Sequence, residues 1–138
     1  MRFILFMIPN ISEEQYEQGP SVEDVEAMMK FNEELTQAGV LLALDGLHPT
    51  SKGARVTSQG GKRTVTDGPF TEAKELVGGY WVIDVKSKEE AVEWATRCPL
   101  DDNAIIEVRQ VQELSDFPED VQEAAQLSQR PPEQTSAD

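Results

Sequence analysis

The chain has 138 residues, a length that favours one domain with one core. Its 26 acidic and 12 basic residues give a formal net charge of -14, which opposes binding to nucleic acid or to anionic membranes. One cysteine, Cys98, excludes an internal disulfide, and one histidine, His48, excludes the usual multi-histidine metal site. Without a long apolar run or a signal-peptide pattern, we expect a cytoplasmic protein with no membrane contact.

The first third of the chain predicts a strand, a helix and a second strand. Residues 2–8 are apolar throughout, as in a buried strand, and the polar stretch 10–20 reads as a loop. Ser21 can cap a helix over 21–38, and Gly39 can end it. Residues 40–47 then predict a strand that ends at His48-Pro49.

The rest of the chain begins with a strong hairpin signal. Two alternating segments within 54–66 flank Gly60-Gly61, a pair of residues suited to a two-residue turn. Ser87 and Glu90 form a capping-box pattern at the start of a helix. The remaining expected elements are a loop with at most one helical turn over 70–76, strand 78–85, helix 87–98, strand 104–114, a short helix from Pro118 and a frayed end over 131–138.

This order of elements predicts an α+β fold of the ferredoxin-like kind. Residues 2–47 and 78–114 each form a βαβ unit, with the hairpin inserted between them, so one sheet carries both helices on one face. The other face is left bare and apolar, and we expect a second copy to cover it in a homodimer. The predicted domain spans 1–114, and 115–138 is a polar C-terminal extension.

Three stretches, "GLHPTSKGARV", "VTDGPFTEAKELVGGYWVIDV" and "SKEEAVEWATRCP", resemble the YCII-related family. More narrowly the chain resembles the DGPF-domain subgroup, named for the turn seen here at residues 67–70, and the likeness covers roughly residues 1–114. The resemblance implies a dimeric α+β barrel and an active site built on a His and an Asp. Some relatives act on chlorinated aromatic rings. Others are linked to extracytoplasmic-function sigma factors, which implies a regulatory role.

His48 and Asp67 are the candidate catalytic pair. His48 lies at a strand end, and an ordinary imidazole pKa of about 6.5 suits proton transfer at neutral pH. Asp67 can orient such a histidine, as acidic partners of catalytic histidines do. Each has a plainer reading, because a lone histidine at a strand end is often structural, and Asp before Gly-Pro often caps its own turn.

A local excess of positive charge lies between residues 52 and 74. It can attract an anionic ligand or can be the ordinary surface of a hairpin. We expect ligand contacts from Ser51, Lys52, Arg55, Lys74 and Tyr80, although packing in a core or an interface is the favoured reading for Tyr80.

Three functions remain open from the sequence. The first is an enzyme that uses His48 and Asp67 for acid/base chemistry on a cyclic or aromatic anion, without a metal or an organic cofactor. The second is a non-catalytic ligand-binding or regulatory module that uses the same cleft. The third is a structural interaction domain.

Overall fold

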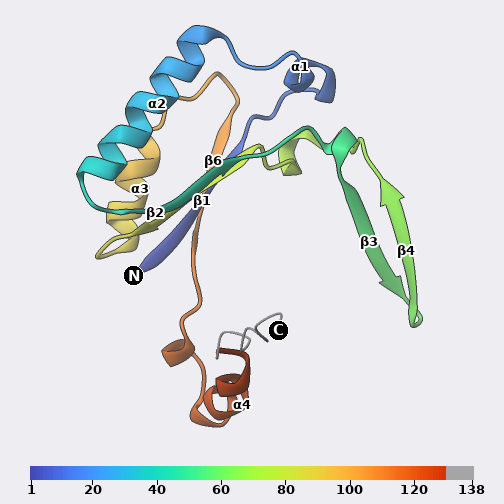
Figure 1. Ribbon diagram of the computed structural model, residues 1–138, viewed down its shortest axis with the longest axis vertical. Coiled ribbons are helices and arrows are strands. Elements are labelled where there is room, and N and C mark those ends of the chain that lie inside the picture. The colour runs from blue at the N-terminus through green and yellow to red at the C-terminus, as the bar shows by residue number, and fades with distance from the viewer. Residues whose placement is uncertain (130–138) are drawn as a thin grey trace, which may run out of the picture.

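The structure is a computed structural model of the chain, and it describes residues 1–129 (Figure 1). The strands are β1 Arg2–Ile8, β2 Leu41–Gly46, β3 Ala54–Gln59, β4 Lys62–Asp67, β5 Gly79–Asp84 and β6 Ile105–Gln110. The α-helices are α1 Glu13–Glu17, α2 Val22–Gln37, α3 Lys88–Arg97 and α4 Glu119–Gln129. Three short 3-10 turns lie at Thr50–Lys52, Ala73–Glu75 and Leu114–Asp116. The expected end over 131–138 lies outside the described residues.

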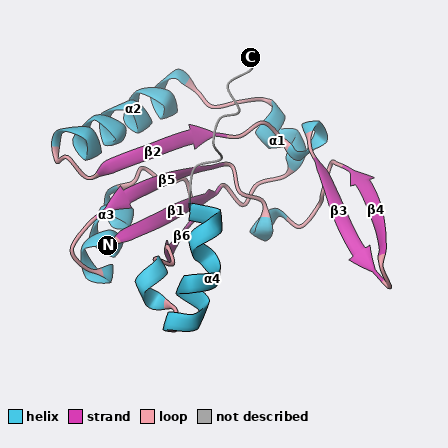
Figure 2. Ribbon diagram, turned by 60° about the horizontal axis from the view of Figure 1, so that its bottom comes forward, coloured by secondary structure: helices cyan, strands magenta, loops and turns pink. Residues whose placement is uncertain are grey.

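Four strands form the main sheet, in the order β2-β5-β1-β6, and every neighbouring pair is antiparallel (Figure 2). Helices α2 and α3 connect β1 to β2 and β5 to β6, and both cover the same face of the sheet (Figure 2). The fold is therefore mixed α+β with antiparallel sheets, as the sequence predicted.

The core lies between this sheet and the two helices. Leu5 of β1 pairs with Trp81 of β5, and alternate residues on the same face, including Phe3 and Ile83, are buried with them. The Trp81 ring meets Phe31 of α2 edge to face at 5.6 Å. Its indole N–H donates to Asn32 Oδ1 at 2.8 Å, so the buried polar atom is satisfied. Trp81 therefore packs on the helices.

The other face of the sheet is less well covered. Ile4, Phe6 and Val82 point to this side and are only partly buried. Helix α4 lies on this side of the sheet, opposite α2 and α3 (Figures 1 and 2).

The ends of α2 agree with the sequence pattern. Ser21 Oγ accepts the Asp24 N–H at 3.1 Å, and Gly39 takes the left-handed φ of +71° that helix-ending glycines favour. At α3, Ser87 Oγ accepts the Glu90 N–H at 3.1 Å as predicted. The Glu90 carboxylate, however, accepts from the Lys86 N–H rather than closing a full capping box.

One additional helix and one strand end differ from the sequence expectation. The stretch 10–20 is not all loop, because α1 forms there on a capping box in which Ser12 and Gln15 bind each other's backbone N–H groups. The last strand ends at Gln110 rather than at residue 114. Beyond it the Val111 N–H still donates to the Arg2 carbonyl, and the chain then turns at Leu114–Asp116.

Strands β3 and β4 form a separate two-stranded ribbon, here called the arm (residues 54–67). Gly60 and Gly61 have φ of +57° and +80°, the left-handed pair that a tight hairpin turn requires. The predicted hairpin is thus confirmed. The arm projects away from the main sheet (Figure 1), and every residue of both its strands is exposed.

Candidate functional site

A large open groove lies at the end of the main sheet where β2 and β5 meet α1 and the first half of α2. Its volume is about 700 Å³, and this size suits a small organic molecule. Its apolar wall includes Val25, Met28, Met29, Leu44, Leu47, Trp81 and Leu100, and its carboxylates are Glu17, Asp24, Asp45 and Asp101. No lysine or arginine is found among the described residues that line it.

His48 reaches this groove from the loop that follows β2. The side chain is exposed, and it also lines a narrow adjoining cavity of about 20 Å³ together with Glu13 and Tyr16 of α1. His48 therefore lies at the wall of both the groove and this smaller cavity. A ring in such a place can exchange protons with a bound molecule and with solvent.

Tyr16 anchors the loop that carries His48. Its hydroxyl lies within hydrogen-bonding distance of the carbonyl oxygens of Leu47 and Gly78, and the Leu47 N–H donates to the same Gly78 oxygen at 2.9 Å. A Cβ at position 78 would lie 2.9 Å from Pro9 Cγ, so glycine permits this close approach. Burial and then the charge of Glu13 raise the pKa of Tyr16, which keeps the phenol protonated as a donor.

The Asp67-Gly68-Pro69-Phe70 turn packs directly on the segment after His48. A Cβ at Gly68 would fall 1.8 Å from the Thr50 carbonyl oxygen, so only glycine fits this contact. The Gly68 N–H donates to the Gly53 carbonyl at 3.0 Å, and the Phe70 N–H donates to Thr50 Oγ1 at 2.9 Å. Thr50 in turn donates to Glu13 Oε2 at 3.0 Å. The two motifs quoted from the sequence thus meet in space, against α1.

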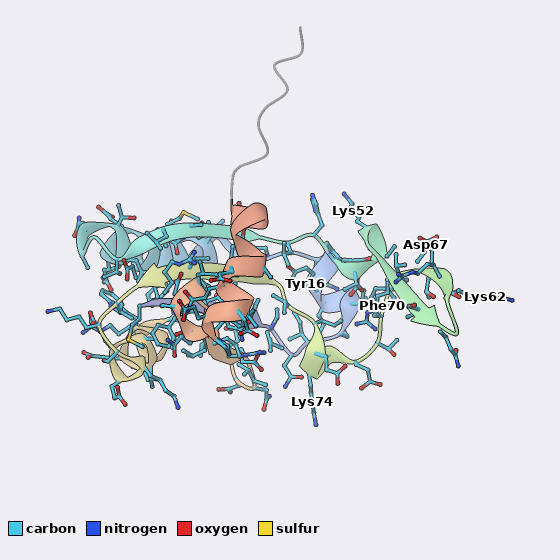
Figure 3. All side chains as sticks on the ribbon, turned by 90° about the horizontal axis from the view of Figure 1, so that it is seen from below. Tyr16, Lys52, Lys62, Asp67, Phe70 and Lys74 are labelled. Carbon is cyan, nitrogen blue, oxygen red and sulfur yellow. The ribbon has the colours of Figure 1, made fainter. Side chains whose placement is uncertain are left out.

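Asp67 itself lies at the base of the arm, paired in register with Ala54. Figure 3 places it on the arm side of Phe70, with Tyr16 on the body side. Within residues 1–129 its carboxylate makes no hydrogen bond or ion pair, so the expected capping of the turn by this side chain is not seen. It lines neither cavity, and no hydrogen bond joins it to His48 in this structure.

The five residues expected to contact a ligand do not lie together in the structure. Tyr80 lines the groove, and its hydroxyl donates to Asp45 Oδ2 at 2.8 Å; this bond and the Asp45 charge raise the pKa of Tyr80. Ser51 is engaged with α1, because its N–H donates to Glu13 at 2.9 Å and its hydroxyl to Glu17 at 3.0 Å. The Arg55 guanidinium stacks 3.9 Å above the Phe70 ring.

The lysines of this region do not converge on one point. Lys52, Lys62 and Lys74 point outward in different directions (Figure 3), and none of them lines the groove. The positive stretch of sequence is therefore not a positive pocket around His48.

Tyr16 and Glu13 are the site residues that sequence reasoning missed. The available signal was the Ser12–Gln15 capping box, which marks a helix start beside an aromatic residue. No group of three His, Cys, Asp or Glu side chains suited to a metal ion occurs in the part of the chain that the structure describes. No described helix has the length and apolar character needed to cross a membrane.

The structure is therefore that of a small α+β protein in which His48 lines both a groove and a smaller adjoining cavity. The YCII-related domain matches residues 1–115, and the chain belongs to this family. An uncharacterised protein of Rhizobium meliloti (strain 1021), R00369, is 30% identical over 96 residues, covering 67% of this chain and 77% of the relative. A solved structure of the 5-chloro-2-hydroxyhydroquinone dehydrochlorinase TftG from Burkholderia phenoliruptrix AC1100, in complex with 2,5-dihydroxybenzoquinone, is 15% identical. It covers 82% of this chain and 96% of its own, with a TM-score of 0.40.

Proposed function

We propose that the protein binds a small aromatic molecule of the phenol class in the groove and that His48 accepts its proton. The observation that carries this proposal is the position of the chain's single histidine at one end of a groove of about 700 Å³. An apolar cleft with few converging polar groups is the usual form of a small-molecule site.

The lining of the groove favours a neutral ligand over the anion expected from the sequence. Four carboxylates and no described lysine or arginine line it, so a ligand that enters already charged would meet like charge. A phenol enters neutral, packs its ring on the apolar wall and offers one acidic proton. His48 can take that proton, and the imidazolium that forms offsets the repulsion between the phenolate and the four carboxylates.

Asp67 completes the proposal as the group that orients His48. Gly68 packs on Thr50, which follows His48 by two residues. The Asp67 turn therefore lies beside the segment that carries His48. The proposal requires the exposed side chains of Asp67 and His48 to rotate toward each other when the ligand binds. Such rearrangement is common, since catalytic hydrogen bonds often tighten only in the complex. Tyr80 is the one candidate ligand contact that the groove retains.

A non-catalytic binding module is the second candidate. The flexible side chains of Met28 and Met29 in the wall favour it, since methionine-rich surfaces adapt to several ligands. In this case the groove holds the phenol without turnover, and the protein acts as a sensor in a regulatory circuit such as sigma-factor signalling.

Several finer features belong to the same proposal. The strand order and the two crossover helices on one face support a ferredoxin-like arrangement. The partly buried apolar side chains Ile4, Phe6 and Val82 support a homodimer through the sheet face opposite α2 and α3, the side on which α4 also lies. We further assign the chain to the DGPF subgroup and to the cytoplasm, and we divide it into a domain at 1–114 and an extension at 115–138.

Binding is tested by ligand-observed NMR with matched panels of phenols and benzoates. We expect saturable binding of phenols and weaker binding of benzoates. Leu100→Arg places a long charged side chain in the groove wall and should abolish phenol binding, whereas Val92→Arg on α3, at a similarly exposed position, should leave it unchanged. Equal binding by both variants, or stronger binding of benzoates, would overturn the proposal.

The role of His48 is tested on the same ligands. His48→Gln should retain most of the binding, because the apolar wall is intact, and should abolish proton transfer from the bound phenol, seen as loss of the phenolate absorbance. If the wild-type protein binds phenols without forming the phenolate, the binding-module alternative holds.

A further inference from the structure

The arm presents an apolar patch that nothing in its own chain covers. Val56 and Val65 face each other across the two strands and are 64% and 65% exposed. Both strands of the arm are edge strands, and a two-stranded ribbon is only marginally stable without packing. The exposed valine pair of the arm is therefore suited to pack against another surface.

The charge of the arm selects the kind of surface. The arm, residues 54–67, contains three basic residues and one acidic residue, in a chain whose overall charge is -14. Two arms would repel each other for this reason. A nucleic acid would meet the positive arm but would be repelled by the strongly negative body. An acidic protein surface with exposed apolar side chains is the complementary partner.

Helix α2 carries such a surface on the same chain. Val22, Val25 and Met29 recur at helical spacing and are 73%, 41% and 57% exposed. Helix α2 contains five acidic residues and one basic residue, and Glu23 and Glu26 flank this apolar stripe. The arm cannot reach its own α2, since the two lie at opposite ends of the molecule (Figures 1 and 2).

We propose that the arm of one copy docks on the apolar stripe of α2 in a second copy. Val56 and Val65 pack on Val22 and Val25, and Arg63, on the same face of the arm, meets Glu23 or Glu26. The contact joins unlike surfaces, so in a two-fold dimer it occurs twice, once in each direction. This inference goes beyond the proposed function. Val25 and Met29 also line the groove, so a docked arm would lie along the α2 wall of the groove.

Disulfide trapping between two labelled copies tests the docking. Full-length Val56→Cys carrying a tag is mixed with untagged Val22→Cys and oxidised mildly. The native Cys98 does not interfere, because burial raises the pKa of its thiol to about 12. The matched control is Thr57→Cys, the adjacent residue on the opposite face of the arm.

We expect the 56–22 disulfide to form at least about tenfold more than the 57–22 disulfide, the ratio that about 1.4 kcal/mol of preference gives. Glu23→Lys with Glu26→Lys in the Val22→Cys copy should suppress it, and Arg63→Glu in the arm copy should restore it. The proposal would be overturned by equal yields at 56 and 57 or by a product dominated by 56–56 disulfides. It would also be overturned if no disulfide forms and the arm instead binds duplex DNA. Because Leu100 is not in this contact, failure here leaves the groove experiment intact.

Discussion

The strands of the sheet body and of the arm differ in composition, in pairing and in burial. In the body, β1 is paired on both sides, and its Leu5 is completely buried between two strands and two helices. In the arm, each strand is paired on one side only, and its two valines stay exposed. An apolar residue in a strand is therefore not buried by strand formation alone. It is buried where the strand is paired on both sides and packs against the helices.

The groove lies in the body, and α1 connects its wall to the base of the arm. Thr50 contacts the turn that ends the arm and also Glu13 of α1, while Tyr16 of the same helix holds the His48 loop. The five-residue helix α1 thus links the arm to the cavity wall.

The largest expected effect contrasts one residue of each region. Leu5→Ala leaves a cavity in the core and should lower the free energy of unfolding by about 3 kcal/mol. Val56→Ala in the arm should change it by less than about 0.5 kcal/mol, because this side chain is already exposed. Urea unfolding at low protein concentration measures both. Comparable losses would show that the arm belongs to the same packed unit as the body.

An intermediate effect is expected at the junction of the two regions. Gly68→Ala drives a methyl group into the Thr50 carbonyl and should cost about 1–3 kcal/mol, with faster amide exchange at Gly68 and Phe70. Gly46→Ala is the control, since a Cβ there meets nothing within 4 Å and the backbone φ is ordinary. If the two variants are equally stable, the turn is not seated on Thr50.

The smallest expected effect concerns a surface ion pair that ties the chain after β6 to the body. Arg2 donates to both oxygens of Glu113 at 2.7 and 3.0 Å, and this bond lowers the pKa of Glu113 below its ordinary value of 4.5. A lowered carboxyl pKa stabilises the folded state above the unfolded value and loses that effect as the pH falls through the folded value.

Glu113→Gln should therefore slightly lower the melting temperature at pH 7 and leave it unchanged at about pH 2, below both values. Glu107→Gln removes the looser pair with Arg109, at 3.4 Å, and should be silent at both pH values. An equal effect of Glu113→Gln at both pH values would show that the ion pair does not cause it.

Most of the fold could be predicted because its signals are local. The Ser21 cap, the Gly39 end of α2 and the Gly60-Gly61 turn each act over a few residues, and all three are confirmed. Helix α1 was missed because five residues carry little periodicity. Its Glu13 and Glu17 bind Thr50 and Ser51, so part of its support comes from a distant segment.

The site was only partly predictable because it depends on contacts between distant segments. His48 followed from its place after a strand, and it does line the groove. The basic residues are close in sequence, but the hairpin carries Arg55, Lys62 and Arg63 along an exposed ribbon and away from the cavity. Tyr16 enters the site from a segment more than thirty residues earlier in the chain than His48, as its bond to Leu47 shows. No short-range pattern encodes that meeting.

The most direct measurement follows the ring protons of His48 by NMR, which is simple to assign because the chain has one histidine. The account predicts that a phenol shifts these signals in a saturable way and that Asp67→Asn changes the pH titration of the ring. Glu13→Gln serves as the comparison for the neighbouring carboxylate and Asp102→Asn as the remote control. Signals that do not respond to any phenol and titrate identically in all four proteins would contradict the proposed site.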